Sequence, residues 1–223
     1  NWEKLEQYDN NAPKTMNAHL HVLEAYTLLY QCWKDNGLKK RLEFCVDLFM
    51  NRIYDPSRKH FNLFFDNEWN SLVEMDSYGH DVETGWLLCE AARTLENQDL
   101  IEQTNQLALD VTEACLAEGM SDKGYMIYEK KGDRKTKHAS WWGQIETVIA
   151  CVNAWQISGS DVYLQSVDTV WTFVKDHMVD KEYGEWYSDC FDGEPKKEAP
   201  KVSMWRCPYH TVRLGVEMYN RLK

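Results

Sequence analysis

A histidine and a carboxylate stand three residues apart in the stretch Ser77–Glu83, at the start of an apolar segment. His80 and Glu83 would share one face of a helix's first turn, because residues three apart are neighbours on a helix. Histidine titrates near neutral pH, so it can act as an acid or as a base. The stretch therefore predicts a site for polar chemistry at a helix N-terminus, where anionic oxygens are also favoured.

Three other polar clusters lie where a long loop enters an apolar helix. They are Asn17 with His21, Trp141 with Trp142, and Trp205 with His210. Each histidine taken alone is more often a cap or a satisfied core residue. Three of them at equivalent positions of a repeat would lie on one face. The two adjacent tryptophans diverge by about 100° on a helix, so we expect one of them to face the site.

The elements that must position these clusters recur in a fixed order, with a period of about 60 residues. Each unit has a buried helix, a short turn, an amphipathic helix, and a long loop with a short strand or hairpin. The first buried helix is predicted to begin near Thr15 or Asn17 and to end at Asn36–Gly37, and the other two are predicted over residues 79–95 and 140–157. The amphipathic helices are predicted over residues 38–49, 98–118 and 161–178, and the strands or hairpins over 61–72, 124–130 and 184–190. A last helix starts at Pro208 or Tyr209.

This order predicts an all-α fold, an (α/α)6 toroid or barrel of helical hairpins with short β-hairpins in the long loops. Inner helices entered from the same side would bring the polar clusters together. The pattern has about seven helices, whereas a closed toroid of six hairpins needs twelve. We therefore expect residues 1–223 to form one barrel domain that lacks N-terminal helices. The chain begins with Asn1 rather than Met, which fits a processed or truncated protein.

Composition excludes several classes of function. The formal net charge of -11 argues against nucleic acid as a partner, which needs basic patches. No signal peptide or membrane-spanning segment is recognisable, so we expect no membrane partner. The 7 cysteines are an odd number without zinc-binding spacing. They are best interpreted as reduced core thiols of a cytoplasmic protein.

Other chemistries fit the sequence less well. Neither a Gly-rich phosphate loop nor a G-x-S-x-G motif is present. His19, His21 and His80 offer ligand atoms for a metal, but their spacing does not favour one. A paired-carboxylate glycosidase on a similar toroid is an alternative, although the emphasis on histidine speaks against it. Its candidate carboxylates are Asp76, Asp81, Glu83 and Glu146.

Four segments, spread over nearly the whole chain, resemble motifs of the cellobiose 2-epimerases, which belong to the N-acylglucosamine 2-epimerase superfamily. They are Asn17–Tyr26, Ser77–Glu83, Trp141–Glu146 and Trp205–His210. The resemblance implies an (α/α)6 barrel without a metal or redox cofactor, acting on a small sugar substrate.

The resemblance also implies a proton-transfer mechanism. The sugar ring opens to the aldehyde, one histidine removes the proton from C2, and a cis-enediolate forms. After rotation about C2–C3, a second histidine returns a proton to the other face. His80 and His210 would be this catalytic pair, and His210 is also a candidate for assisting ring opening.

The remaining roles implied by the resemblance concern substrate binding. His21 and Asn17 would hold the O1/O2 end and stabilise the enediolate. Glu83 would orient or tune a histidine. Trp205 would stack on the reducing sugar, and Trp142 on the partner sugar.

The family also has an active-site arginine, in its N-terminal part, that steadies the enediolate oxygen, and no residue here matches it. The function expected is 2-epimerisation of a β-1,4-linked disaccharide, cellobiose or mannobiose. The alternatives are an aldose–ketose isomerase or an N-acylglucosamine 2-epimerase of the same superfamily, and a non-catalytic carbohydrate-binding toroid.

Overall fold

A computed structural model describes residues 12–223 of the chain, so the first eleven residues of the predicted domain lie outside the described part. The chain separates into two compact units. Unit 1 consists of the described part of Asn1–Asp76 together with Leu87–Leu107. Unit 2 consists of Ser77–Trp86 together with Ala108–Lys223. The single barrel domain over residues 1–223 stays a prediction.

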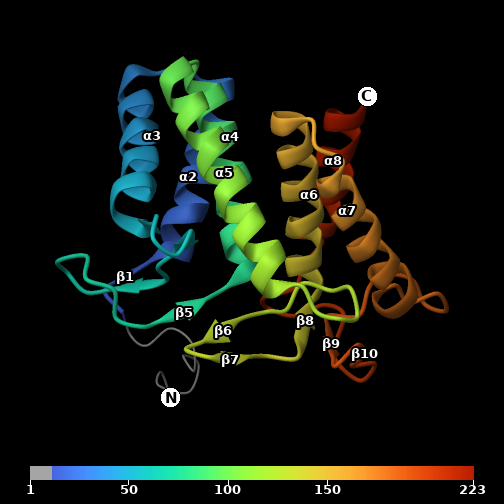
Figure 1. Ribbon diagram of the computed structural model, residues 1–223. Helices are drawn as coiled ribbons and strands as arrows, with labels where there is room; N and C mark the ends of the chain where they lie inside the picture. The colour runs from blue at the N-terminus through green and yellow to red at the C-terminus, as the bar shows by residue number, and fades with distance from the viewer. Residues whose placement is uncertain (1–11) are drawn as a thin grey trace. The chain divides into compact units, whose positions relative to one another are not determined.

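Seven α-helices lie within residues 12–223 (Figure 1). They are α2 (Met16–Cys32), α3 (Asn36–Leu48), α4 (Tyr78–Leu95), α5 (Gln98–Gly119), α6 (Trp141–Ser158), α7 (Val162–Phe173) and α8 (Tyr209–Leu222). A π-helical turn extends α3 (η1, Phe49–Ile53) and another extends α7 (η2, Val174–Met178). The prediction of an all-α fold with short strands in the long loops is confirmed.

In unit 1, α2 packs on α3, and both helices begin at side-chain caps. Thr15 accepts a hydrogen bond from the Ala18 N–H at 3.2 Å. Asp35 accepts one from the Leu38 N–H at 2.9 Å. Such caps satisfy backbone donors that have no partner within a helix.

The prediction that α2 is buried on nearly all sides is wrong for unit 1. Leu20 and Leu23 are fully buried, but Val22, Leu28 and Leu29 are 42–57% exposed. The reason is that its helical neighbours within unit 1, α3 and the end of α4, cover only one stripe of α2. The apolar composition of a helix does not determine how many other elements pack around it.

The strands of unit 1 also differ from the hairpin predicted over residues 61–72. β3 (His60–Phe61) pairs antiparallel with β2 (Tyr54–Asp55), and β4 (Phe64–Phe65) pairs with β1 (Lys14–Thr15). The predicted hairpin around Asp66–Asn67 is present over the shorter range 64–72. The Asp66 N–H donates to the Asn70 carbonyl oxygen, the Leu72 N–H donates to the Phe64 carbonyl oxygen, and Phe65 forms a bridge with Ser71. The carboxylate of Asp66 organises the turn by accepting the Glu68 and Asn70 N–H groups. β5 (Met75–Asp76) ends the unit's first segment.

In unit 2, α6 packs on both α7 and α8 (Figure 1). Residues Gly143 to Ala154 of α6 are all buried, which confirms the prediction of a buried helix. Ser140 caps its start by accepting from the Gly143 N–H at 3.2 Å. Gly159 ends it with φ 72°, a left-handed conformation that glycine adopts without strain.

The loops of unit 2 form two small antiparallel groups of strands. β6 (Lys130–Lys131) pairs with β7 (Arg134–Lys135), and β9 (Asp189–Phe191) pairs with β8 (His138–Ser140) and with β10 (Glu194–Pro195). The strand predicted over residues 124–130 is wrong. Met126 instead bonds to the buried Gln144 side chain, which accepts from its N–H and donates to its C=O, both at 2.8 Å.

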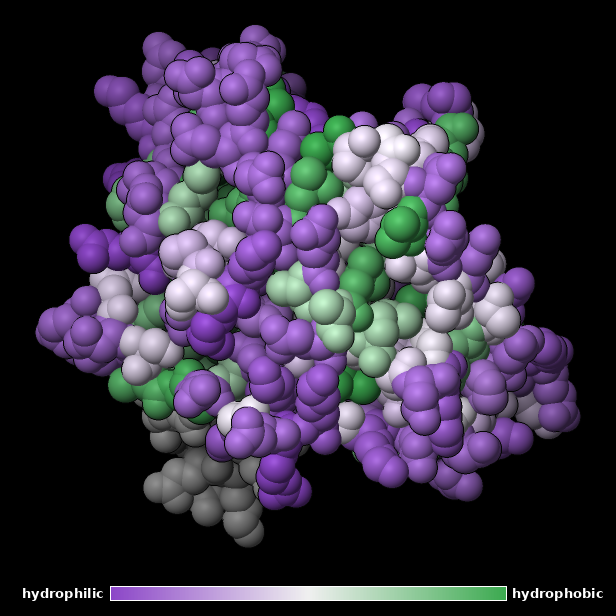
Figure 2. All heavy atoms as spheres, in the orientation of Figure 1, coloured by the Kyte–Doolittle hydropathy of each residue, from purple (hydrophilic) through white to green (hydrophobic). Residues whose placement is uncertain are grey.

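Hydrophilic side chains cover most of the face shown in Figure 2, as the net charge of -11 suggests. No helix among residues 12–223 combines the length and apolar character that a membrane crossing needs. Five of the seven cysteines are buried, as expected for core thiols. Burial raises the pKa of the Cys151 thiol to about 12, so this thiol stays protonated at neutral pH.

Candidate active site

His80 lies in the first turn of α4, where that helix approaches α6. Its Nδ1 is 2.7 Å from the Ser77 hydroxyl, and its ring centroid is 4.5 Å from that of Trp142. Gly79 allows this approach, because a Cβ there would lie 2.6 Å from Trp142 Cζ3. The local sequence therefore positions His80 by a hydroxyl on one side and an indole on the other.

His210 lies in the first turn of α8 and contacts the same indole. Its ring stacks on Trp142 with the centroids 5.7 Å apart and the planes at 29°. Its Nδ1 is 2.7 Å from Oε1 of Glu146 on α6. Both histidines are thus held through Nδ1.

Two buried carboxylates and one arginine support this pair. Arg213, one turn after His210 on α8, donates through Nη1 to Glu83 Oε1 at 2.6 Å and to Glu146 Oε1 at 3.1 Å. Trp86 donates its indole N–H to Glu146 Oε2 at 2.9 Å. The guanidinium carbon also lies 5.3 Å from the Trp86 ring centroid. Glu146 therefore accepts from three side chains, and Glu83 is paired with Arg213.

The electrostatics of this cluster follow from burial. Glu83 and Glu146 are 1% and 0% exposed, and buried carboxylates need charged or hydrogen-bonding partners to stay ionised. Arg213 supplies such a partner to both carboxylates through Nη1. Because Glu146 accepts from Nδ1–H, it fixes the tautomer of neutral His210 with the lone pair on Nε2.

A metal is a second use for such a cluster. Glu83, Glu146 and His210 offer ligand atoms that all lie within 4.8 Å of one another. However, the Oε1 atoms of both carboxylates already bind Arg213. A divalent ion would have to displace a guanidinium held by both carboxylates, so the donor set fits the ion pair better than a metal.

The structure brings together four of the residues predicted from sequence. His80, Glu83, Trp142 and His210 all belong to unit 2 and share the contacts described above. Trp205 also belongs to unit 2, but it lies on the loop before α8 and is 82% exposed.

Asn17 and His21 lie on α2 in unit 1. Asn17 is exposed in the first turn. The His21 side chain is 45% exposed, and its Nδ1 lies 3.2 Å from Oε2 of Glu24. Their part in a common site stays a prediction.

Sequence reasoning missed Arg213 and the bonding partners of the histidines. Arg213 follows His210 by three residues, which places both on one face of a helix, and this spacing was an available signal. Glu146 was noted only as a possible glycosidase carboxylate. Its contact with His210 joins positions 64 apart in the chain, which no local pattern reveals. Ser77, the partner of His80, lies in the motif itself.

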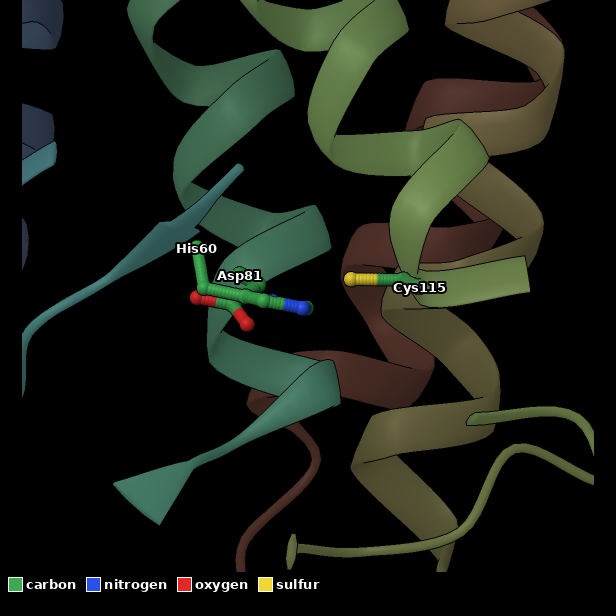
Figure 3. A group of neighbouring side chains, drawn as sticks. All are labelled: His60, Asp81 and Cys115. Carbon is green, nitrogen blue, oxygen red and sulfur yellow. The ribbon is translucent and has the colours of Figure 1, made fainter. Parts of the chain in front are cut away.

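Two other candidate carboxylates lie apart from this cluster in their contacts. Asp76, in unit 1, forms an ion pair with Arg58 at 2.5 Å. Asp81 is fully buried on α4, and Figure 3 draws it together with Cys115 of α5. The Cys115 thiol lies 3.9 Å from the carbonyl oxygen of Tyr78. Glu146, which contacts His210 and Arg213, and Glu83, which contacts Arg213, are therefore the carboxylates of the site.

Comparison with known proteins places the chain beside sugar epimerases. The family model described as N-acylglucosamine 2-epimerase matches residues 2–213. A cellobiose 2-epimerase of Bacteroides fragilis is 40% identical over 220 residues, which are 96% of this chain and 55% of the relative.

Two solved structures are also similar. A sugar epimerase from a ruminal bacterium has a TM-score of 0.93 and 34% identity, covering 98% of this chain and 56% of the other. The cellobiose 2-epimerase of Bacillus thermoamylovorans B4167 has a TM-score of 0.91 and 35% identity, covering 97% and 56%. The chain thus spans a little over half the length of these relatives.

Proposed function

The chain belongs to the N-acylglucosamine 2-epimerase family, and from its site we propose that it acts as a sugar 2-epimerase. The observation that carries this proposal is the pair His80 and His210, which contact one indole and are each held through Nδ1. Inversion at a carbon needs a base on one face and an acid on the other. Two separately held histidines provide these two groups.

In the proposed reaction the sugar opens to its aldehyde form, which makes the proton on C2 acidic. One histidine takes this proton through Nε2, and a cis-enediolate forms. Rotation about C2–C3 then presents the other face of C2, and the second histidine returns a proton. For His210, the Glu146 carboxylate at 2.7 Å stabilises the imidazolium formed in this exchange. For His80, the Ser77 hydroxyl can donate or accept, so it can follow either protonation state.

The proposed substrate is a β-1,4-linked disaccharide, cellobiose or mannobiose, whose reducing unit interconverts between glucose and mannose. Two relatives that this chain resembles are cellobiose 2-epimerases. Trp142, beside both histidines, and exposed Trp205 offer flat apolar faces of the kind on which sugar rings stack. Asn17 and His21 remain candidates for holding the O1/O2 end, and Glu83 acts here through Arg213.

The experiment that tests the proposal is product analysis with the full-length natural protein. Cellobiose and mannobiose are incubated separately, and the products are identified by NMR. The C2 epimer as the main product supports the proposal. A ketose as the main product would indicate an aldose–ketose isomerase, which returns the proton to C1. Release of monosaccharides would indicate a glycosidase, and sugar binding without any reaction would indicate a carbohydrate-binding protein.

A further inference from the structure

The loop between β10 and α8 carries exposed apolar side chains around one buried arginine. Val202, Met204 and Trp205 are 72–82% exposed, whereas Arg206 is 3% exposed. Reciprocal backbone hydrogen bonds of 3.0 and 3.2 Å between Ser203 and Arg206 close a tight turn here. A charged side chain buried within an exposed loop is costly unless it is paired, so its partners indicate its role.

Arg206 ties this loop to two other parts of unit 2. Its Nη2 donates to Glu185 Oε2 at 3.2 Å and to the Trp186 carbonyl oxygen. Its guanidinium carbon lies 5.1 Å from the ring centroid of Trp141, the first residue of α6. The Trp141 ring in turn meets His210 edge-on, with centroids 6.2 Å apart. Arg206 therefore links the exposed indole of Trp205, its neighbour in sequence, to the surroundings of His210.

Two donor atoms in this contact are not used by the protein. Nη1 of Arg206 and Nε1 of Trp141 are buried and have no hydrogen-bond partner among residues 12–223. The charge of Arg206 is already paired with Glu185 through Nη2, so its unused Nη1 suits a neutral oxygen rather than an anion. Sugar hydroxyls are neutral oxygens of this kind.

We propose that Arg206 is a specificity-determining residue for the sugar unit attached to the reacting one. It fixes the Trp205 loop next to Trp141, and its unused Nη1 is the donor that we assign to a hydroxyl of this sugar unit. This inference rests on the proposed function, because it assigns the second unit of the same substrate. It predicts that Arg206 acts on disaccharide binding and not on the proton transfer at C2.

The test compares Arg206→Gln, Arg206→Lys and the control Arg134→Gln, an exposed arginine on β7, in the full-length natural protein. KM and kcat are measured for cellobiose and for free mannose. Binding of cellobiitol, which keeps the second sugar but has no aldehyde to enolise, is measured by calorimetry. Arg206→Gln should raise KM for cellobiose and Kd for cellobiitol about 10–100-fold, the factor for a lost charged hydrogen bond. Its kcat and its reaction with mannose should change by less than about threefold. Arg206→Lys should be intermediate, and Arg134→Gln unchanged.

Equal losses with cellobiose and mannose, or an unchanged cellobiitol Kd in a folded Arg206→Gln protein, would overturn the inference. If that variant does not fold, Glu185→Gln replaces it, because it removes one partner of Nη2 and leaves Arg206 in place. The deciding quantity is then the increase in KM for cellobiose relative to that for mannose. Failure of the wild-type protein to epimerise any sugar would refute the proposed function instead. Cellobiitol binding would then still decide the role of Arg206.

Discussion

Replacing Glu146 by glutamine should abolish most of the epimerisation at C2 without creating a cavity in the core. The change keeps the volume of a side chain that is 0% exposed. It removes an ionised acceptor that serves His210 at 2.7 Å, Trp86 at 2.9 Å and Arg213 at 3.1 Å. An amide has one acceptor oxygen and one donor nitrogen, so it cannot satisfy three donors.

Both orientations of the new amide are unfavourable. If its oxygen faces His210 and Arg213, its NH2 group meets the indole N–H of Trp86, and the imidazolium loses its carboxylate. If its NH2 group faces His210, Nδ1 must become an acceptor, and Nε2 then carries the proton and is no longer a base. Loss of a positioned general base costs about 10²–10⁴-fold in kcat. The unmet donor should cost about 1–3 kcal/mol in the free energy of unfolding.

The assay is the rate of C2 epimerisation followed by NMR, with urea unfolding of the same samples. The matched control is Glu217→Gln on α8, whose carboxylate bonds to Arg221 at 2.8 Å but contacts neither histidine. We expect this control to retain at least about half of the wild-type rate, as for a surface change of this size. A folded Glu146→Gln protein with a near-wild-type rate would refute the assignment of Glu146 as the group that orients His210.

Two further changes test the positioning of His80 and the electrostatics of the loop. Gly79→Ala places a Cβ 2.6 Å from Trp142 Cζ3, so it should destabilise the protein by about 1–3 kcal/mol and lower kcat, measured by urea unfolding and steady-state kinetics; unchanged stability would contradict the close approach. Lys201 donates to Asp180 and, with backbone hydrogen bonds, lowers the pKa of that carboxyl to about 2. Because this pKa is lowered, the carboxylate stabilises the folded state at pH values above its ordinary pKa near 4. That stabilisation is lost as the pH falls through about 2. Lys201→Met should therefore raise the pKa of Asp180 in a carbon NMR titration, and an unchanged value would show that the ion pair contributes nothing.

The fold was predictable where a local pattern and its packing agree. α6 is apolar on most sides and is capped by Ser140 and Gly159, and the structure has it buried from Gly143 to Ala154. α2 has a similar composition but is covered on one stripe only, because burial depends on neighbours that the sequence of a helix does not specify. The strand predicted over residues 124–130 failed for a related reason: the backbone of Met126 is satisfied by Gln144, which lies 18 positions later in the chain.

The site follows the same division. The placement of His80 beside Glu83 was predictable because helix spacing puts residues three apart on one face. The bond of Arg213 to Glu83 joins residues 130 positions apart. No periodicity within one element predicts this contact, although the spacing of three residues from His210 placed Arg213 on the same face of α8.

The central claim is that two histidines exchange the proton on C2, and deuterium incorporation tests it most directly. The full-length protein, His80→Asn and His210→Asn are each incubated with cellobiose and with mannobiose in D2O, and NMR follows deuterium at C2. The account predicts deuterated epimer from the wild-type protein. It predicts no epimer from either variant. Each variant should still exchange the C2 proton for deuterium on one of the two sugars, and the sugar should differ between His80→Asn and His210→Asn. Formation of epimer without deuterium at C2, or epimerisation by either single variant at the wild-type rate, would contradict it.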